Sequence, residues 1–191
     1  MHAAGLATMA FYYFDFRDAR KQDRHGLLSS LLSQLSTESD PCYELLSRLY
    51  VENAGGTRKP TRGALLKCLK DMLSLPGQGK IFIIVDALDE CPNSSGTPSA
   101  REEVLDFIEE LVELELPDVH LCVTSRPEID IRRVLEPLTS LKISLHDEIG
   151  QKEDILEYIK SVVRFDRKMR RWKEDDKQLL VDTLSDKADG M

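Results

Sequence analysis

Three carboxylates stand directly after the most apolar segment of the chain. The segment covers residues 81–85, and the acids that follow it are Asp86, Asp89 and Glu90. A short apolar run of this kind predicts a β-strand buried on both faces, as in the centre of a parallel sheet. Asp86 would then lie at the carboxyl end of the strand, which is the edge where open α/β sheets bind ligands.

These acids could hold Mg²⁺ and activate water during phosphoryl transfer. Mg²⁺ prefers oxygen ligands and keeps several of its waters, so one or two carboxylates suffice. We expect Asp86 to hold the metal, directly or through water, and Asp89 or Glu90 to polarise the attacking water, with Glu90 as the first choice. The alternative is a strand that ends in a solvated acidic turn. The length of the apolar run and the D-x-x-D-E spacing favour a functional site.

A second polar motif, Thr124-Ser125-Arg126, follows the next apolar strand, which is predicted at residues 119–124. The carboxyl ends of parallel strands meet at one edge of a sheet, so these three residues are expected beside Asp86. The planar guanidinium of Arg126 could bind a γ-phosphate. Alone, the motif would indicate only a surface arginine in a turn, and its support comes from lying one helix after the acidic strand.

Strands and helices alternate along the chain. The expected strands cover residues 9–16, 80–86, 119–124 and, more weakly, 141–145. The expected helices cover residues 27–35, 43–50, 61–75, 99–112, 129–135, 151–163 and 173–188. Thr61 is expected to cap one helix, and Ser99 with Glu102 fits a capping box at the start of another. The pattern predicts an α/β fold, a partial parallel sheet flanked by helices, with a helical C-terminal extension.

The composition excludes several classes of protein. The chain has 191 residues, of which 31% are charged, and a net charge of −8, which argues against a general nucleic-acid binder. The basic run at residues 164–173 is expected to be a solvated helix or turn, because acids follow it directly. The apolar residues 3–14 are too few to cross a membrane and lack the basic region of a signal peptide.

The cysteines and histidines form no recognisable metal site. Cys42, Cys68, Cys91 and Cys122 lie far apart in the sequence and include no C-x-x-C pair. Neither a zinc site nor a disulfide framework is indicated, and reduced thiols of a cytoplasmic protein are expected. The four histidines likewise share no metal-ligand spacing.

The two polar motifs carry a resemblance to the NACHT domain of the STAND class of P-loop NTPases, in the version common in fungal NLR-like proteins. The segments that look familiar are residues 11–18, 81–91, 122–128, 144–147 and 188–191. The second of these is similar to a Walker B strand and the third to a sensor 1 motif. The resemblance implies a P-loop NTPase type of sheet in residues 1–148 and the start of a helical extension in residues 149–191.

The same resemblance implies roles for the site residues. Asp86 would bind Mg²⁺ together with ATP or GTP, Asp89 and Glu90 would serve hydrolysis, and Arg126 would sense phosphate, with Thr124 and Ser125 also lining the nucleotide site. In an intact relative, the bound nucleotide would switch a cytoplasmic signalling protein between a closed and an assembled form. Its partners would be other proteins or further copies of itself, with no membrane or nucleic acid.

One feature of the family is missing. No G-x-x-x-x-G-K-[ST] loop occurs, and Gly77-Gln78-Gly79-Lys80 precedes a strand, whereas a phosphate loop follows a strand and opens a helix. The family sheet resembles the order 2-3-4-1-5. Without strand 1, residues 141–145 either pair with residues 119–124 or leave a gap.

The missing loop leads us to expect weak or absent nucleotide binding and no hydrolysis by this chain alone. The alternative is a non-catalytic interaction scaffold that binds a protein partner through its open sheet. A third possibility is a fragment of a larger gene product.

Overall fold

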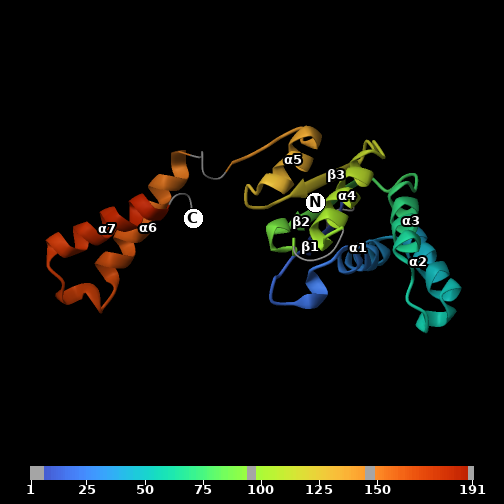
Figure 1. The fold of residues 1–191 in the computed structure, drawn as a ribbon, viewed down its shortest axis with the longest axis horizontal. Coiled ribbons are helices and arrows are strands. Elements are labelled where there is room, and N and C mark those ends of the chain that lie inside the picture. The colour runs from blue at the N-terminus through green and yellow to red at the C-terminus, as the bar shows by residue number, and fades with distance from the viewer. Residues whose placement is uncertain (1–6, 94–97, 145–148, 189–191) are drawn as a thin grey trace. The chain divides into compact units, whose positions relative to one another are not determined.

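A three-stranded parallel sheet organises the first part of the chain (Figure 1). The structure is a computed structural model that describes residues 7–93, 98–144 and 149–188. The strands are β1 (Ala7–Tyr13), β2 (Lys80–Asp86) and β3 (Val119–Val123), in the order β1-β2-β3. The register pairs Tyr13 with Asp86, and Val85 with Val123. All three strands therefore end at the same edge, and β2 covers the predicted residues.

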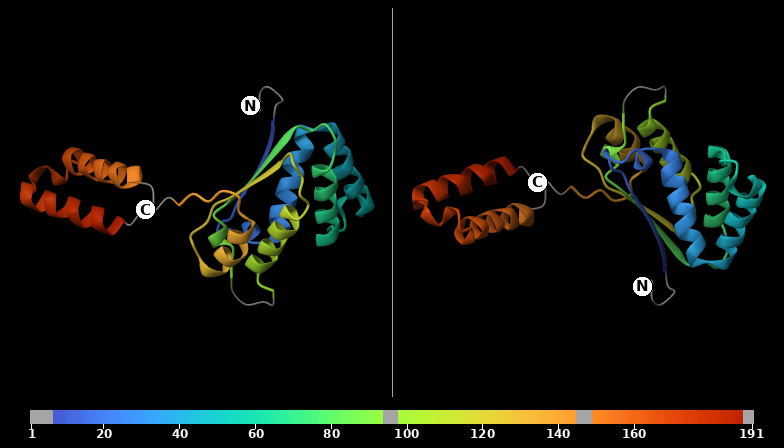
Figure 2. Two further views of the ribbon diagram at one scale, coloured as in Figure 1. Left: turned by 90° about the horizontal axis from the view of Figure 1, so that it is seen from above. Right: turned by 90° about the horizontal axis from the view of Figure 1, so that it is seen from below.

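Five helices accompany this sheet. They are α1 (Arg24–Glu38), α2 (Asp40–Glu52), α3 (Arg62–Leu73), α4 (Ala100–Val112) and α5 (Ile129–Leu138). Both views in Figure 2 show α1 to α4 on the same side of the sheet. The predicted caps are confirmed: the Thr61 side chain accepts the Ala64 N–H, and Ser99 and Glu102 form a capping box. The expected α/β architecture, a parallel sheet flanked by helices, is likewise confirmed.

Burial of β2 alternates along the strand. Ile81, Ile83 and Val85 are buried against the helices, whereas Phe82 is 37% exposed. The expectation of a strand buried on both faces is therefore wrong, because α1 to α4 cover only one side of the sheet. The other face carries exposed side chains from all three strands: Met9, Phe11, Tyr13, Phe82, His120 and Cys122. Phe82 and His120 stack there, with ring centroids 4.9 Å apart.

The weak strand expected at residues 141–145 is not formed at the described residues 141–144. Leu141 is 75% exposed and Ile143 is 67% exposed. A strand needs a neighbour to accept and donate its backbone hydrogen bonds, and the described strands β1, β2 and β3 pair only with one another. Residue 145 lies outside the described residues, as do residues 146–147 and 189–191 of the familiar-looking segments.

The chain divides into two units, Met1–Thr139 and Ser140–Met191. The second contains two contacting helices, α6 (Ile149–Phe165) and α7 (Glu174–Ala188), with Val163 and Val181 buried. The boundary expected after residue 148 falls at the end of the undescribed residues 145–148. In the described part of the chain, no helix has the length and apolarity needed to span a bilayer.

Candidate functional site at the carboxyl edge of the sheet

Asp86 and Thr124 meet where β2 and β3 end. The Thr124 hydroxyl donates a hydrogen bond to Asp86 Oδ1 and accepts one from the Ala87 N–H at 3.1 Å. The Thr124 N–H donates to the Val85 carbonyl at 2.9 Å, which continues the pairing of the two strands. The prediction that the two motifs lie side by side at one sheet edge is therefore confirmed.

A left-handed residue turns the chain after Asp86. Ala87 has φ 54° and ψ 46°, a left-handed backbone conformation that residues other than glycine seldom adopt. Leu88 follows and is fully buried, and its N–H donates to the Thr124 carbonyl at 3.0 Å. Burial of Leu88 compensates for the strain at Ala87, and the short 3-10 turn Leu88–Glu90 keeps Asp89 and Glu90 at the sheet edge.

Asp89 holds Arg126 through both the backbone and the side chain. Asp89 Oδ1 accepts the Arg126 N–H at 3.0 Å, and Oδ2 lies 3.4 Å from Arg126 Nε. The Asp89 side chain is 12% exposed, whereas that of Arg126 is 82% exposed. The surface ion pair contributes little stability by itself. The backbone bond, in contrast, fixes the start of the loop that leads from β3 to α5.

Glu90 faces a third element. Its Oε2 accepts the Phe16 N–H at 3.2 Å, just after β1. Asp86 and Asp89 thus bond to one segment, the motif at residues 124–126, and Glu90 bonds to the segment after β1. Among the described residues, no three His, Cys, Asp or Glu side chains gather closely enough to form a multidentate metal site. Mg²⁺ needs only one or two carboxylates, and the exposed oxygens of Asp86 and Thr124 are donors of the required type.

The glycines before β2 lie at the opposite end of the strand from Asp86. Gly77 and Gly79 have positive φ, and Gln78 between them is a structural residue. Its amide donates to the carbonyls of Met72 and Leu75, and its oxygen accepts from the Cys42 thiol at 3.3 Å. This segment is a turn that closes α3 onto the sheet, in agreement with its rejection as a phosphate loop.

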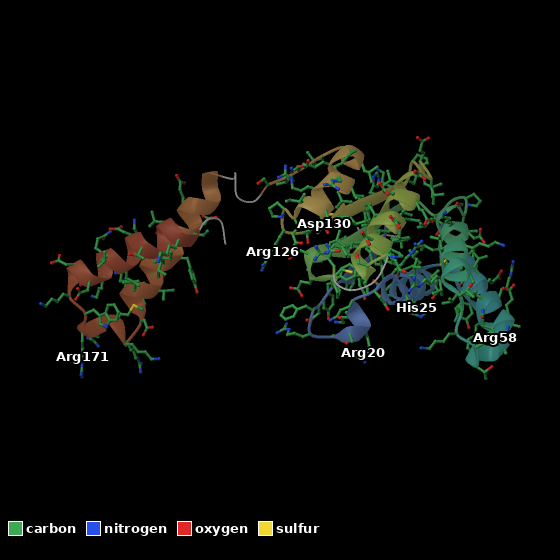
Figure 3. The ribbon with its side chains drawn as sticks, in the orientation of Figure 1. Arg20, His25, Arg58, Arg126, Asp130 and Arg171 are labelled. Atoms are coloured by element: carbon green, nitrogen blue, oxygen red, sulfur yellow. The ribbon has the colours of Figure 1, made fainter. Side chains whose placement is uncertain are left out.

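The sequence patterns did not single out Arg101, which lies directly beneath the site. Its side chain is only 6% exposed and bonds to Glu128, to Asp130 and to residues 87–91, which we call the acidic turn. Figure 3 labels Asp130 together with Arg126. A signal for Arg101 exists in the sequence, because it shares the helical spacing of Val104 and Leu105 and so falls on the buried face of α4.

Fold and site together define an α/β protein with an acidic and a basic motif joined at the carboxyl edge of a parallel sheet. The family model described as Nephrocystin 3, N-terminal matches residues 2–126, which is well over half of the chain. The chain belongs to this family. The matched region includes all three strands and both motifs. Comparisons with curated proteins and with solved structures find no significant match.

Proposed function

We propose that the chain is the Mg²⁺-binding and phosphate-sensing side of a NACHT-like nucleotide-binding module in a STAND-type signalling protein. The observation that carries the proposal is the paired edge: Asp86 with the Thr124 hydroxyl, and Asp89 with Arg126. Such a module would act in the cytoplasm as an ATP- or GTP-dependent switch, and its partners would be other proteins or further copies of itself.

Each edge residue has a distinct role in this proposal. Asp86, with Thr124 beside it, would hold the Mg²⁺ that neutralises charge on the phosphates. Asp89 and Glu90 would orient the attacking water, and Ser125 would line the same site. Arg126 would bind the terminal phosphate with its exposed guanidinium. Since Asp89 already holds this guanidinium, a phosphate has to compete with a carboxylate for it.

The chain by itself is expected to bind nucleotide poorly. Glycine-loop backbone amides supply most phosphate contacts in P-loop proteins, and this sequence contains no such loop. Mg-ATP is therefore expected to bind with a Kd of about 1 mM or weaker. Calorimetric titration measures this affinity, and a micromolar Kd for Mg-ATP or Mg-GTP would contradict the expected deficiency.

Weak binding of Mg-ATP can still show where the nucleotide site lies. At millimolar Mg-ATP, amide NMR signals of Ala87 and Arg126 are expected to shift, and the shifts are expected to disappear in Asp86→Asn and Arg126→Ala. Arg58→Ala is the matched control, because Arg58 is exposed on the loop between α2 and α3, away from the site. Shifts that survive in both site variants, or that lie elsewhere, would refute the assignment.

The edges of the sheet favour a second candidate, a protein-interaction scaffold. At the outer edge of β1, the Gln34 side chain accepts the Phe11 N–H at 3.0 Å and donates to the Phe11 carbonyl at 2.7 Å, so the edge is occupied at Phe11. The Ile81 N–H donates to the Asp118 carbonyl and the Thr124 N–H to the Val85 carbonyl, so the alternation of a parallel ladder turns the backbone groups of Leu121 away from β2. Among the described strands, β3 has β2 as its one neighbour, so these groups lie at its outer edge. An open edge of this kind pairs readily with a strand of another chain.

A second copy of the chain would pair with β3 in antiparallel orientation about a two-fold axis through Leu121. His120 would then lie opposite Cys122 of the other copy in a non-hydrogen-bonded pair, with Cα atoms about 4.5 Å apart, which suits a disulfide. The His120→Cys variant is expected to form covalent dimers under mild oxidation, whereas Arg58→Cys is not. Light scattering should give twice the 21.7 kDa mass. A monomer that never cross-links would exclude self-pairing through β3.

A further inference from the structure

Arg101 is a buried cation with its hydrogen-bonding capacity directed to two loops. On one side, its Nε donates to the Cys91 carbonyl at 2.9 Å and its Nη2 donates to the Asp89 carbonyl at 2.6 Å. These two bonds fix the backbone of the acidic turn. A guanidinium that is 6% exposed has to satisfy its N–H groups within the protein. The position of the acidic turn therefore depends on the position of the Arg101 side chain.

On its other side, Arg101 holds the start of α5. Its Nη1 donates to Glu128 and, at 3.2 Å, to Asp130 Oδ2. The Asn93 side-chain amide donates to the same Asp130 oxygen at 3.0 Å, and the Ser99 hydroxyl donates to Asn93 Oδ1 at 3.0 Å. Burial disfavours the charged guanidinium, but the two carboxylates outweigh burial and raise the Arg101 pKa, so Arg101 stays charged.

These contacts close a ring around the candidate site. Arg101 bonds to the Asp89 carbonyl, and the Asp89 carboxylate accepts the Arg126 N–H. The Arg126 carbonyl accepts the Glu128 N–H at 2.8 Å, and the Glu128 carboxylate returns to Arg101. The acidic turn and the loop at residues 124–128, which we call the Arg126 loop, are 37 residues apart in the sequence at the Asp89–Arg126 contact. Both nevertheless bond to the Arg101 side chain.

We propose that Arg101 is a positioning residue that makes the acidic turn and the Arg126 loop move as one body. Displacement of either loop is then transmitted to the other and to the first turn of α4. The role in nucleotide sensing rests on the function proposed above: a phosphate that draws Arg126 from Asp89 would act through Arg101 on α4 and α5. A lysine could not replace it, because a single ammonium cannot reproduce the planar fork that serves both carbonyls and both carboxylates.

The test perturbs one loop and measures the other, in the full chain and without nucleotide. In the Glu128→Gln/Asp130→Asn double variant, the changes lie at the start of α5, at side chains that are 43% and 35% exposed, so the fold is expected to survive. Hydrogen exchange is read at the Glu90 and Cys91 amides, which bond to Ala87 and Leu88 in the acidic turn. We expect at least fivefold faster exchange there, with unchanged exchange at Ile83 in the sheet.

Substitutions at Arg101 complete the experiment. Arg101→Met and Arg101→Lys are both expected to speed exchange selectively at Cys91 and at the Arg126 amide, because neither retains the fork. Val104→Ala, at a fully buried position on the same helix, is the control for general destabilisation and should speed exchange evenly. Unchanged exchange at the acidic turn in the double variant, or a normal pattern in Arg101→Lys, would overturn the proposal. Because no nucleotide is present, this result is independent of the Mg-ATP titration.

Discussion

Replacing Phe107 with alanine is expected to lower the free energy of unfolding by about 3–5 kcal/mol. Phe107 is fully buried on α4, as are Val104 and Ile108 on the same helix, and Arg24 Cζ lies 5.5 Å from the centroid of the Phe107 ring. Truncation removes the apolar burial of the ring and this cation–π contact, and it leaves a cavity. The cavity can collapse only partly, because the neighbouring strands are fixed to one another by their backbone hydrogen bonds.

Urea unfolding followed by circular dichroism measures this loss. Val112→Ala is the matched control, because Val112 is on the same helix but 36% exposed, and it should cost less than about 1 kcal/mol. A loss below about 1 kcal/mol for Phe107→Ala would show that α4 does not pack beneath the sheet as described. The result bears on function, since α4 also carries Arg101.

Raising the pH from 9 to 10 is expected to destabilise the chain by about 2 kcal/mol through two buried thiols. Burial raises the pKa of Cys91 to about 12 and that of Cys68 to about 11, from an ordinary value of 9.0. The unfolded chain ionises these thiols first. Their stabilising contribution is therefore complete below pH 9 and is lost as the pH rises toward their folded pKa values.

The measurement is the free energy of unfolding across pH 8 to 10, compared between the wild type and the Cys68→Ala/Cys91→Ala variant. The variant is expected to be less stable at pH 8 but to have a much flatter pH dependence, because the two thiols are absent. Burial also raises the pKa of Tyr12, which adds to the pH dependence of the free energy of unfolding in both proteins. Equal slopes in the two proteins would show that the thiols do not carry the effect.

Local signals predicted much of the fold. The apolar run before Asp86 predicted β2 at its observed bounds, and the Thr61 and Ser99 caps marked the starts of α3 and α4. Such signals are reliable because they depend on residues within one turn or one strand. The alternation of strands and helices also predicted that Thr124 and Asp86 would share one edge, and their hydrogen bond confirms it.

Predictions that depended on distant neighbours were less successful. The apolar run at residues 81–85 could not reveal that only one face of the sheet would be covered. Residues 141–144 have the pattern of a strand, but no described strand pairs with their backbone. The partner of Glu90 was also unforeseen, because the Phe16 N–H belongs to the segment after β1, far from Glu90 in the sequence.

By itself, the sequence determined the α/β class, the strand that bears Asp86 and the two motifs that meet at its end. These follow from side-chain spacing and from the rule that parallel strands share a carboxyl edge. Only the tertiary structure decided which acid holds Arg126, which sheet edge stays open, and that Arg101 joins the two motifs. Arg101 acts through backbone carbonyls and carboxylates that come together only when α4 packs against the sheet. No local sequence pattern predicts these contacts, because the partners lie on different segments of the chain.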